Sequence, residues 1–443
     1  MDISALLNRL ALRSDDWSDY ILPSAVNEAK QVVNSKIFSS VYLIGSVCFL
    51  FIALGLYIVP DENSSGQLGF MFFSAIMDIG LILIIPLMLY QNMSGERSNG
   101  NFEMMSITSI TPLKIVLGKW QSGLMQSLVF GSIVIPGLIY CYFFNEVAIS
   151  VIFICIFMTL LASQFTIIVS IFLCSLGALK TTRLSLQTIS GIASLIVLTT
   201  TLSIKGGMTF SDSFISNLFE IDFIVSFCIF IVILFTIECF LIAVSAAQLS
   251  SYAANKSTLP RIIYSILIVE VTILFLIGNS FSYLVLDFLI PIILLVHFFI
   301  TFFFLLEKDE LSKKIYLELT KKSGAAKRIY KTLFYPGKSS AFLLFVTQTI
   351  ILWGAFLFYL IEKPATYQMN EEKITSVISC LLFYISCIYL TLRLILRILP
   401  RAKTIILRFS AIFVLLLIFI IPLFFYINSS NDKIWLTMNI FIY

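Results

Sequence analysis

The chain alternates between long apolar runs and short polar connections. Eleven runs are long enough to cross a bilayer, since about 20 helical residues span its hydrocarbon core. They cover residues 37–59, 70–91, 121–143, 147–177, 184–204, 222–248, 260–278, 283–306, 340–361, 374–398 and 404–427. The pattern therefore predicts an all-α, polytopic integral membrane protein with about 11 transmembrane helices.

The composition agrees with this fold class. Of 443 residues, 59% are hydrophobic and 12% are charged, whereas soluble proteins have about 25% charged residues. The eight cysteines all lie in apolar runs without a Cys-x-x-Cys pair, and the sequence has a single histidine. We therefore expect no disulfide framework, no metal site and no Ser-His-Asp triad.

Residues 1–36 contain two short amphipathic segments. Apolar residues at positions 3, 6, 7 and 10 follow helical spacing, and a second such run begins at Ser24. Both are too short to bury a core, so we expect helices that lie on the cytoplasmic leaflet. The rest of the chain divides into a six-helix core, 37–250, and five additional helices, 251–443.

The positive residues predict the orientation of the chain in the membrane. With a cytoplasmic amino terminus, 25 of the 29 Lys and Arg residues fall in cytoplasmic segments; Lys205, Lys363, Lys373 and Lys433 lie outside. This asymmetry follows the positive-inside rule. We therefore expect a multi-pass protein of the cell (inner or plasma) membrane, without a cleavable signal peptide and with its carboxyl terminus outside.

The most informative polar stretch connects the second and third apolar runs, from 94 to 119. If residues 96–110 are helical, Glu96, Gly100 and Glu103 share one face, with the glycine as a notch between two acidic residues. This face is suited to close approach by a partner protein. The alternative is an ordinary solvated connection with an incidental charge pattern.

The order of residues in this stretch resembles that of ABC type-2 transporter permeases. The matching residues are Glu96-Arg97-x-x-Gly100-x-x-Glu103, then Thr111-Pro112, and then Gly118-Lys119 before an apolar run. Thr111 suits an N-cap and Pro112 the first helical position, so the next helix should begin near Leu113. In the family, this connection carries a short cytoplasmic coupling helix that docks on a separate ATPase subunit. Family members often have Thr and Leu where this chain has Asn101 and Met104.

The resemblance covers best about residues 20–250, and it implies a transport subunit rather than an enzyme. It implies export of a lipid, a polysaccharide, a drug or another hydrophobic compound, with a second permease copy or a homologous permease as partner. ATP and Mg would be bound by the partner ATPase, so this chain would hold no cofactor. No nucleic acid is expected as a partner. The five additional helices depart from the simplest family pattern and leave the stoichiometry open.

The basic loop at 307–340 is the largest polar segment, with nine Lys or Arg residues and four acidic ones. We expect it to fix the topology and to attract anionic lipid; a docking surface for a partner protein is the alternative. Its Gly337-Lys338-Ser339 resembles the end of a P-loop. Thr332 stands where that motif requires a glycine, and no strand is predicted before it. The sequence therefore predicts that the ATPase is another polypeptide.

Three acidic residues, Asp78, Glu238 and Glu270, lie inside apolar runs. A charge there must face a cavity, pair with a partner or be protonated. Each can contact the substrate or an ion, or it can form an interhelical hydrogen bond that fixes packing. Because Glu238 and Glu270 occupy consecutive runs, they can approach each other and relay a proton. The alternative functions are therefore a proton-coupled secondary transporter that uses this pair or, less favoured, a membrane-embedded lipid-processing enzyme.

Other polar or helix-breaking residues inside the runs have simpler interpretations. His297 is expected to be a packing residue, because no second His or Cys accompanies it. Arg393 and Arg397 can extend to the cytoplasmic interface. Pro86, Pro136, Pro291 and Pro422 predict kinks in their helices.

Overall fold

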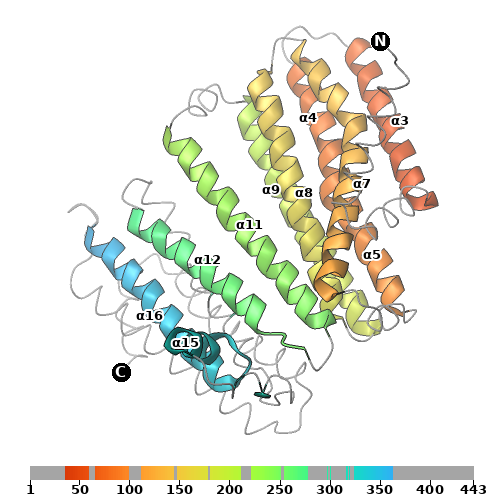
Figure 1. The fold of residues 1–443 in the computed structure, drawn as a ribbon. Coiled ribbons are helices and arrows are strands. Elements are labelled where there is room, and N and C mark those ends of the chain that lie inside the picture. The colour runs from red at the N-terminus through yellow and green to blue at the C-terminus, as the bar shows by residue number, and fades with distance from the viewer. Residues whose placement is uncertain are drawn as a thin grey trace, which may run out of the picture. The chain divides into compact units, whose positions relative to one another are not determined.

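The computed structural model describes the chain in several stretches. They are residues 35–58, 65–98, 111–143, 147–177, 180–210, 221–250, 254–277, 297, 300, 316–317, 319 and 324–362. These residues are predominantly helical, with no strand among them, which confirms the all-α class for the described part of the chain (Figure 1). The chain divides into two compact units, Met1–Ile263 and Tyr264–Tyr443.

The first unit contains the six described spans that are long and apolar enough to cross a membrane. Their elements are α3 (Lys36–Ile58), α4 (Ser65–Asp78), the π-helix η1 (Ile79–Ile84), α5 (Ile85–Ser98), α7 (Pro112–Tyr142), α8 (Ile149–Leu176), α9 (Lys180–Phe210) and α11 (Ile221–Leu249). α4, η1 and α5 follow one another without a break and form a single span. Each of the first six predicted apolar runs thus corresponds to an observed span.

The total of eleven transmembrane helices stays a prediction. The apolar runs at 374–398 and 404–427 lie outside the described residues, and so does nearly all of the run at 283–306. The same holds for the two amphipathic segments predicted before residue 35.

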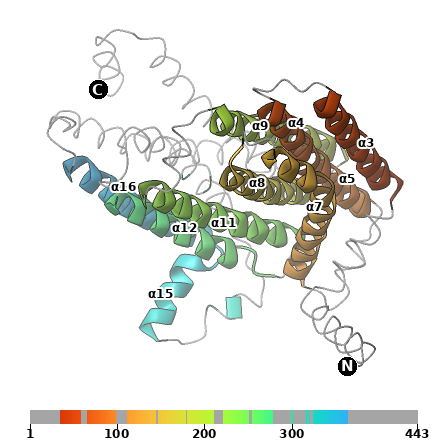
Figure 2. The same cartoon turned by 90° about the horizontal axis from the view of Figure 1, so that it is seen from above.

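α8 lies at the centre of the first unit, where it packs against α5, α7, α9 and α11 (Figure 2). The span of α4, η1 and α5 is the most enclosed of the six. In its apolar part 56% of the residues are buried, whereas in that of α3 only 11% are. Large apolar side chains cover the outer surface instead, and Phe51, Phe153 and Phe235 are 71%, 64% and 62% exposed. Because water disfavours such a surface, the first unit is embedded in a membrane.

The second span changes from α-helix to π-helix over Ile79–Ile84, just before Pro86. A proline inside an α-helix has no N–H to donate, and its ring clashes with the carbonyl four residues earlier. In the π-turn, the Ile85 N–H donates to the Gly80 carbonyl, five residues back. Gly80 also allows α7 to approach closely, since a Cβ at this position would lie 2.0 Å from Cε1 of Phe130. The second span therefore accommodates Pro86 with a π-turn. The other described proline inside a span, Pro136, lies within the long helix α7.

The second unit contains most of α12 (Thr258–Ile277), together with α15 (Ala325–Phe334) and α16 (Lys338–Glu362). His297 lies in this unit and is 1% exposed. Its Nδ1 is 2.6 Å from the Tyr264 hydroxyl, and its Nε2 is 3.0 Å from the Thr349 hydroxyl. Both ring nitrogens have hydrogen-bond partners, as the predicted packing role requires.

Candidate functional site: two buried ion pairs in the first unit

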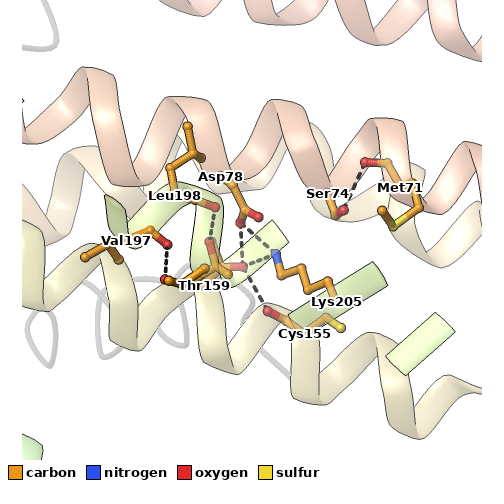
Figure 3. A network of polar contacts seen from close by, with 10 residues as sticks. Met71, Ser74, Asp78, Cys155, Thr159, Val197, Leu198 and Lys205 are labelled. Carbon is orange, nitrogen blue, oxygen red and sulfur yellow. Dashed lines mark hydrogen bonds and ion pairs between the residues drawn. The ribbon is translucent and has the colours of Figure 1, made fainter. Parts of the chain in front are cut away.

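Asp78 is the last residue of α4, and its carboxylate lies where three helices meet (Figure 3). Oδ1 accepts a hydrogen bond from Nζ of Lys205, on α9, at 2.6 Å. Both side chains are enclosed, with 0% of Asp78 and 2% of Lys205 exposed. The two residues therefore form an ion pair that neutralises both charges inside the bundle.

Thr159 of α8 joins Asp78 and Lys205, and these three residues are called the buried cluster below. The Thr159 hydroxyl accepts a hydrogen bond from Nζ of Lys205 at 2.6 Å. It can donate its single proton either to Oδ1 of Asp78 or to the Cys155 carbonyl, each 2.9 Å away. The buried cluster thus connects α4, α8 and α9 at one depth in the bundle.

The surroundings of the buried cluster leave little free space. A cleft beside Lys205, lined by Cys155, Met158, Thr201 and Ile204, is mainly apolar and has room for about one water molecule. Oδ2 of Asp78 is buried and has no hydrogen-bond partner among the described residues. In this conformation the site is too small for a substrate, which favours the packing interpretation of Asp78 over direct substrate contact.

Lys205 is buried inside the bundle, whereas the sequence predicted a position outside the membrane. The apolar run at 184–204 ended just before it, and the lysine was placed outside the membrane. α9 instead continues to Phe210 and carries Lys205 into the bundle. The physical reason is that a lysine within a helix can be buried when a carboxylate neutralises it, and Asp78 supplies that carboxylate.

A second ion pair lies at the end of the same span, close to Ser98. Nζ of Lys119, on α7, donates to Oε1 of Glu96, on α5, at 2.6 Å. Lys119 is 3% exposed and Glu96 is 29% exposed. With a rise of about 1.5 Å per residue, Glu96 is roughly 25 Å along the span from Asp78, close to the thickness of a bilayer core.

Two arginines add contacts next to this pair. Nη1 of Arg97 donates to the carbonyls of Cys174 and Ser175, both at 2.8 Å, at the end of α8. The Cys174 carbonyl also accepts a hydrogen bond from the Gly177 N–H at 3.3 Å, and the negative end of the helix dipole attracts a cation to these last-turn carbonyls. Nη1 of Arg183, on α9, donates to the Ser94 carbonyl at 2.9 Å.

The residues Ser94, Glu96, Arg97, Lys119 and Arg183 are called the clamp below. Through them, the end of α5 is bonded to the start of α7, the end of α8 and the start of α9. Tyr90 adds one more connection, because its hydroxyl donates to the Arg183 carbonyl at 2.7 Å. Four helices are therefore held together at the point where the segment 99–110 leaves the bundle.

A row of hydroxyl side chains runs along α8 between the buried cluster and the clamp. It consists of Thr159, Ser163, Thr166 and Ser170, each at most 2% exposed. The Ser163 hydroxyl is 3.1 Å from that of Ser127 on α7, and the Ser170 hydroxyl is 2.8 Å from that of Ser190 on α9. Small polar residues let membrane helices approach closely and hydrogen bond across the interface. The sequence interpretation missed this row, although its helical spacing inside an apolar run was a visible signal.

Three other residues of the predicted coupling loop lie at the start of α7. Thr111 occupies the N-cap position and Pro112 the first helical position, as the sequence predicted. Gly118 is buried next to Lys119. Gly100 and Glu103 lie outside the described residues, so the acidic face of the predicted coupling helix is described only at Glu96. There, Oε1 is bonded within the chain by Lys119.

Glu238 and Glu270 belong to different units. Glu238 is 6% exposed in α11, and its Oε1 has no hydrogen-bond partner within the described stretches. Glu270 is half-buried in the part of α12 that belongs to the second unit. Their approach to each other therefore stays a prediction.

The described stretches contain no group of three His, Cys, Asp or Glu residues that could hold a metal ion. No family model matches the chain, and no curated protein or solved structure matches it at a significant level.

Proposed function

We propose that this chain is the permease subunit of an ATP-driven ABC transporter of type 2. The proposed cargo is an exported lipid, polysaccharide, drug or other hydrophobic compound. In this proposal the chain lies in the cell membrane with its amino terminus in the cytoplasm, acts with a second permease unit, and contacts a separate ATPase through residues 99–110.

The clamp is the observation that supports this proposal best. The segment 99–110 connects Ser98, the end of α5, to the start of α7, and Glu96 and Lys119 bond these two helices directly. Arg97 and Arg183 bond the same end of α5 to α8 and α9. A force applied to the segment would therefore displace four helices together instead of bending one connection.

The clamp also assigns roles within the Glu-Arg pair of the loop. Glu96 and Arg97 hold the bundle together, because both charges are engaged by groups of the same chain. Docking on the ATPase then falls to the residues beyond α5, with Gly100 as the close-approach site and Glu103 as the charge that faces the partner. This division makes the two functions of the loop separable by mutation.

The proposal is tested by co-expressing the chain with the ABC ATPases of its host that lack a permease domain, beginning with any that is encoded next to its gene. Gly100→Trp should block close approach, and Glu103→Lys should reverse the docking charge. Loss of one partner of a buried interfacial charge pair costs about 2–5 kcal/mol, which corresponds to at least about 30-fold in affinity. Both variants should therefore insert normally but lose co-purification with the ATPase and substrate-stimulated hydrolysis. The chain purified alone should neither bind nor hydrolyse ATP.

Matched controls are available elsewhere in the chain. Gly207 is exposed, and nothing lies within 4 Å of a Cβ added to it, so Gly207→Trp is a matched bulky substitution. Glu62→Lys reverses a charge in the connection predicted to lie outside. Both controls should keep ATPase association. Full association and full transport in Gly100→Trp and Glu103→Lys would refute the proposed docking role.

A proton-coupled secondary transporter is the second candidate, and the buried, unpartnered Oε1 of Glu238 within the described bundle favours it. In that mechanism Glu238→Gln should abolish transport, and a protonophore should stop transport even when ATP is maintained. In the ABC mechanism, transport at constant ATP should survive the protonophore. The two candidates therefore give opposite results in one experiment.

A further inference from the structure

The helix α15 exposes apolar residues and buries a charged one. Its sequence places Ala326, Ile329, Tyr330 and Leu333 at helical spacing on one side. Ile329 is 61% exposed and Tyr330 is 39% exposed, whereas Lys331 is only 8% exposed. A helix in water presents the reverse arrangement, with its cations outside and its apolar side covered.

The charge of α15 is uniform. The helix contains Lys327, Arg328 and Lys331 and has no acidic residue. Lys321 and Lys322 precede it and Lys338 follows it in the sequence. An amphipathic helix with a basic side and an open apolar side is typical of segments that lie on an anionic membrane surface.

A tight corner separates α15 from α16. Gly337 has φ +147°, a backbone conformation that side chains other than that of glycine rarely adopt. The Ser340 hydroxyl contacts the Tyr335 carbonyl at 2.6 Å and the Gly337 carbonyl at 2.9 Å. In Figure 1, α15 is seen end-on while α16 runs across the picture, so the two helices cross at a steep angle.

This corner determines the depth of α15. α16 has 25 residues, which is long enough to cross a bilayer, and it covers the predicted span 340–361. A helix that meets the end of a membrane span at a steep angle lies along the membrane surface. Tyr330 is in ring contact with Phe334 and Tyr335, at 5.4 and 6.3 Å between centroids. Aromatic side chains of this kind concentrate at the level of the lipid headgroups.

We propose that α15 is an interfacial helix that binds the anionic lipid of the leaflet in which α16 begins. The side that carries Ile329 and Tyr330 enters the boundary between headgroups and acyl chains. Lys327 and Arg328 supply the attraction to anionic headgroups. The proposal goes beyond transport itself, because it concerns how the second unit is held against the membrane, and it requires no ATPase.

The test uses the full-length chain in nanodiscs, with a bimane label on a single cysteine in a cysteine-free background. The label is placed at Ile329→Cys or, as a control, at Ile350→Cys, because Ile350 on α16 is 66% exposed and should face lipid. The discs contain phosphatidylcholine alone or mixed with phosphatidylglycerol. Quenching by nitroxide lipids reports contact with the membrane and its depth, and quenching by acrylamide reports contact with water.

We expect the label at 329 to be quenched by a nitroxide near the headgroup, and the label at 350 by a nitroxide deep in the acyl chains. Lys327→Gln combined with Arg328→Gln should weaken the membrane-bound state of α15 by about fivefold per charge in the mixed discs. The pair should have little effect in phosphatidylcholine alone. Acrylamide quenching at 329 equal to that of the free dye, without lipid quenching, would overturn the interfacial position. Equal lipid quenching in both disc types, unaffected by the two Gln substitutions, would overturn the preference for anionic lipid.

Discussion

Replacing Lys205 by methionine should destabilise the first unit by about 3–4 kcal/mol. The variant keeps most of the side-chain volume, but it leaves the buried Asp78 carboxylate without its cation. Removing one partner of a buried ion pair costs about 3–5 kcal/mol. The carboxyl can instead take a proton, which at pH 7 costs about 4 kcal/mol for an aspartate with the ordinary pKa of about 3.9. This second route sets the upper limit. It also predicts that the loss shrinks toward pH 5, because protonation then costs less.

The assay follows the reactivity of single buried cysteines in mild detergent. Cys155 is 1% exposed and lies beside Lys205, and Cys174 is 0% exposed near the other end of α8. Each thiol should react only when the bundle opens, so its labelling rate gives the free energy of opening. Lys114→Met is the control, because Lys114 is exposed on α7.

A double-mutant cycle separates the ion pair from its surroundings. Asp78→Asn combined with Lys205→Met removes both charges and should cost about 1 kcal/mol, since neutral replacement of a buried pair is often nearly neutral in stability. The coupling free energy should therefore be at least about 2 kcal/mol. If Lys205→Met labels as slowly as Lys114→Met, or if the two single losses add, the buried cluster does not stabilise the bundle in the way argued here.

Three further expectations follow from the packing, the clamp and the topology. Gly80→Val should lower the free energy of opening by about 1–3 kcal/mol in the same labelling assay, because a Cβ at this position would lie 2.0 Å from the Phe130 ring. Adding Phe130→Ala should recover part of the loss, and an unchanged labelling rate in Gly80→Val would contradict the close approach. Arg97→Gln should loosen the end of α8 and raise the reactivity of Cys174, whereas Arg97→Lys, which keeps the charge, should do so less; equal reactivity in both variants would argue against a charge effect. Cysteines placed at Ser64 should react with an impermeant reagent outside intact cells and those at Ser323 should not; labelling of Ser323 would reverse the orientation.

The spans of the first unit could be predicted because membrane helices satisfy their own backbone hydrogen bonds. Local hydropathy therefore decides where each helix runs, without knowledge of its neighbours. The start of α7 was visible for a similar reason, since Thr111 and Pro112 act through the local backbone. In both cases the determining interactions lie within a few residues of one another.

The ion pairs depend on helices that meet only in the folded bundle. The sequence marked Asp78 as costly to bury but could not identify Lys205, which is 127 residues away. The hydropathy pattern also predicted that the fifth span ends just before this lysine, because a single charged residue after an apolar run usually marks the membrane boundary. Glu96 and Lys119 were both singled out, but only tertiary packing shows that each is the partner of the other.

The π-turn at Ile79–Ile84 gives the second span one residue more than a straight α-helix between the same two ion pairs would need. If this segment became α-helical without losing a residue, Asp78 would rotate by about 100° and shift by about 1.5 Å relative to Glu96. Lys205 and Lys119 could not then both keep their partners. Deleting a single residue within 79–84 should therefore be tolerated when it is combined with Pro86→Ala, because the deletion removes only the extra residue and the alanine no longer needs the π-turn. A deletion of one residue within α5 should separate one of the two ion pairs. The π-turn is therefore the segment of this span in which a residue can be removed while both ion pairs are kept.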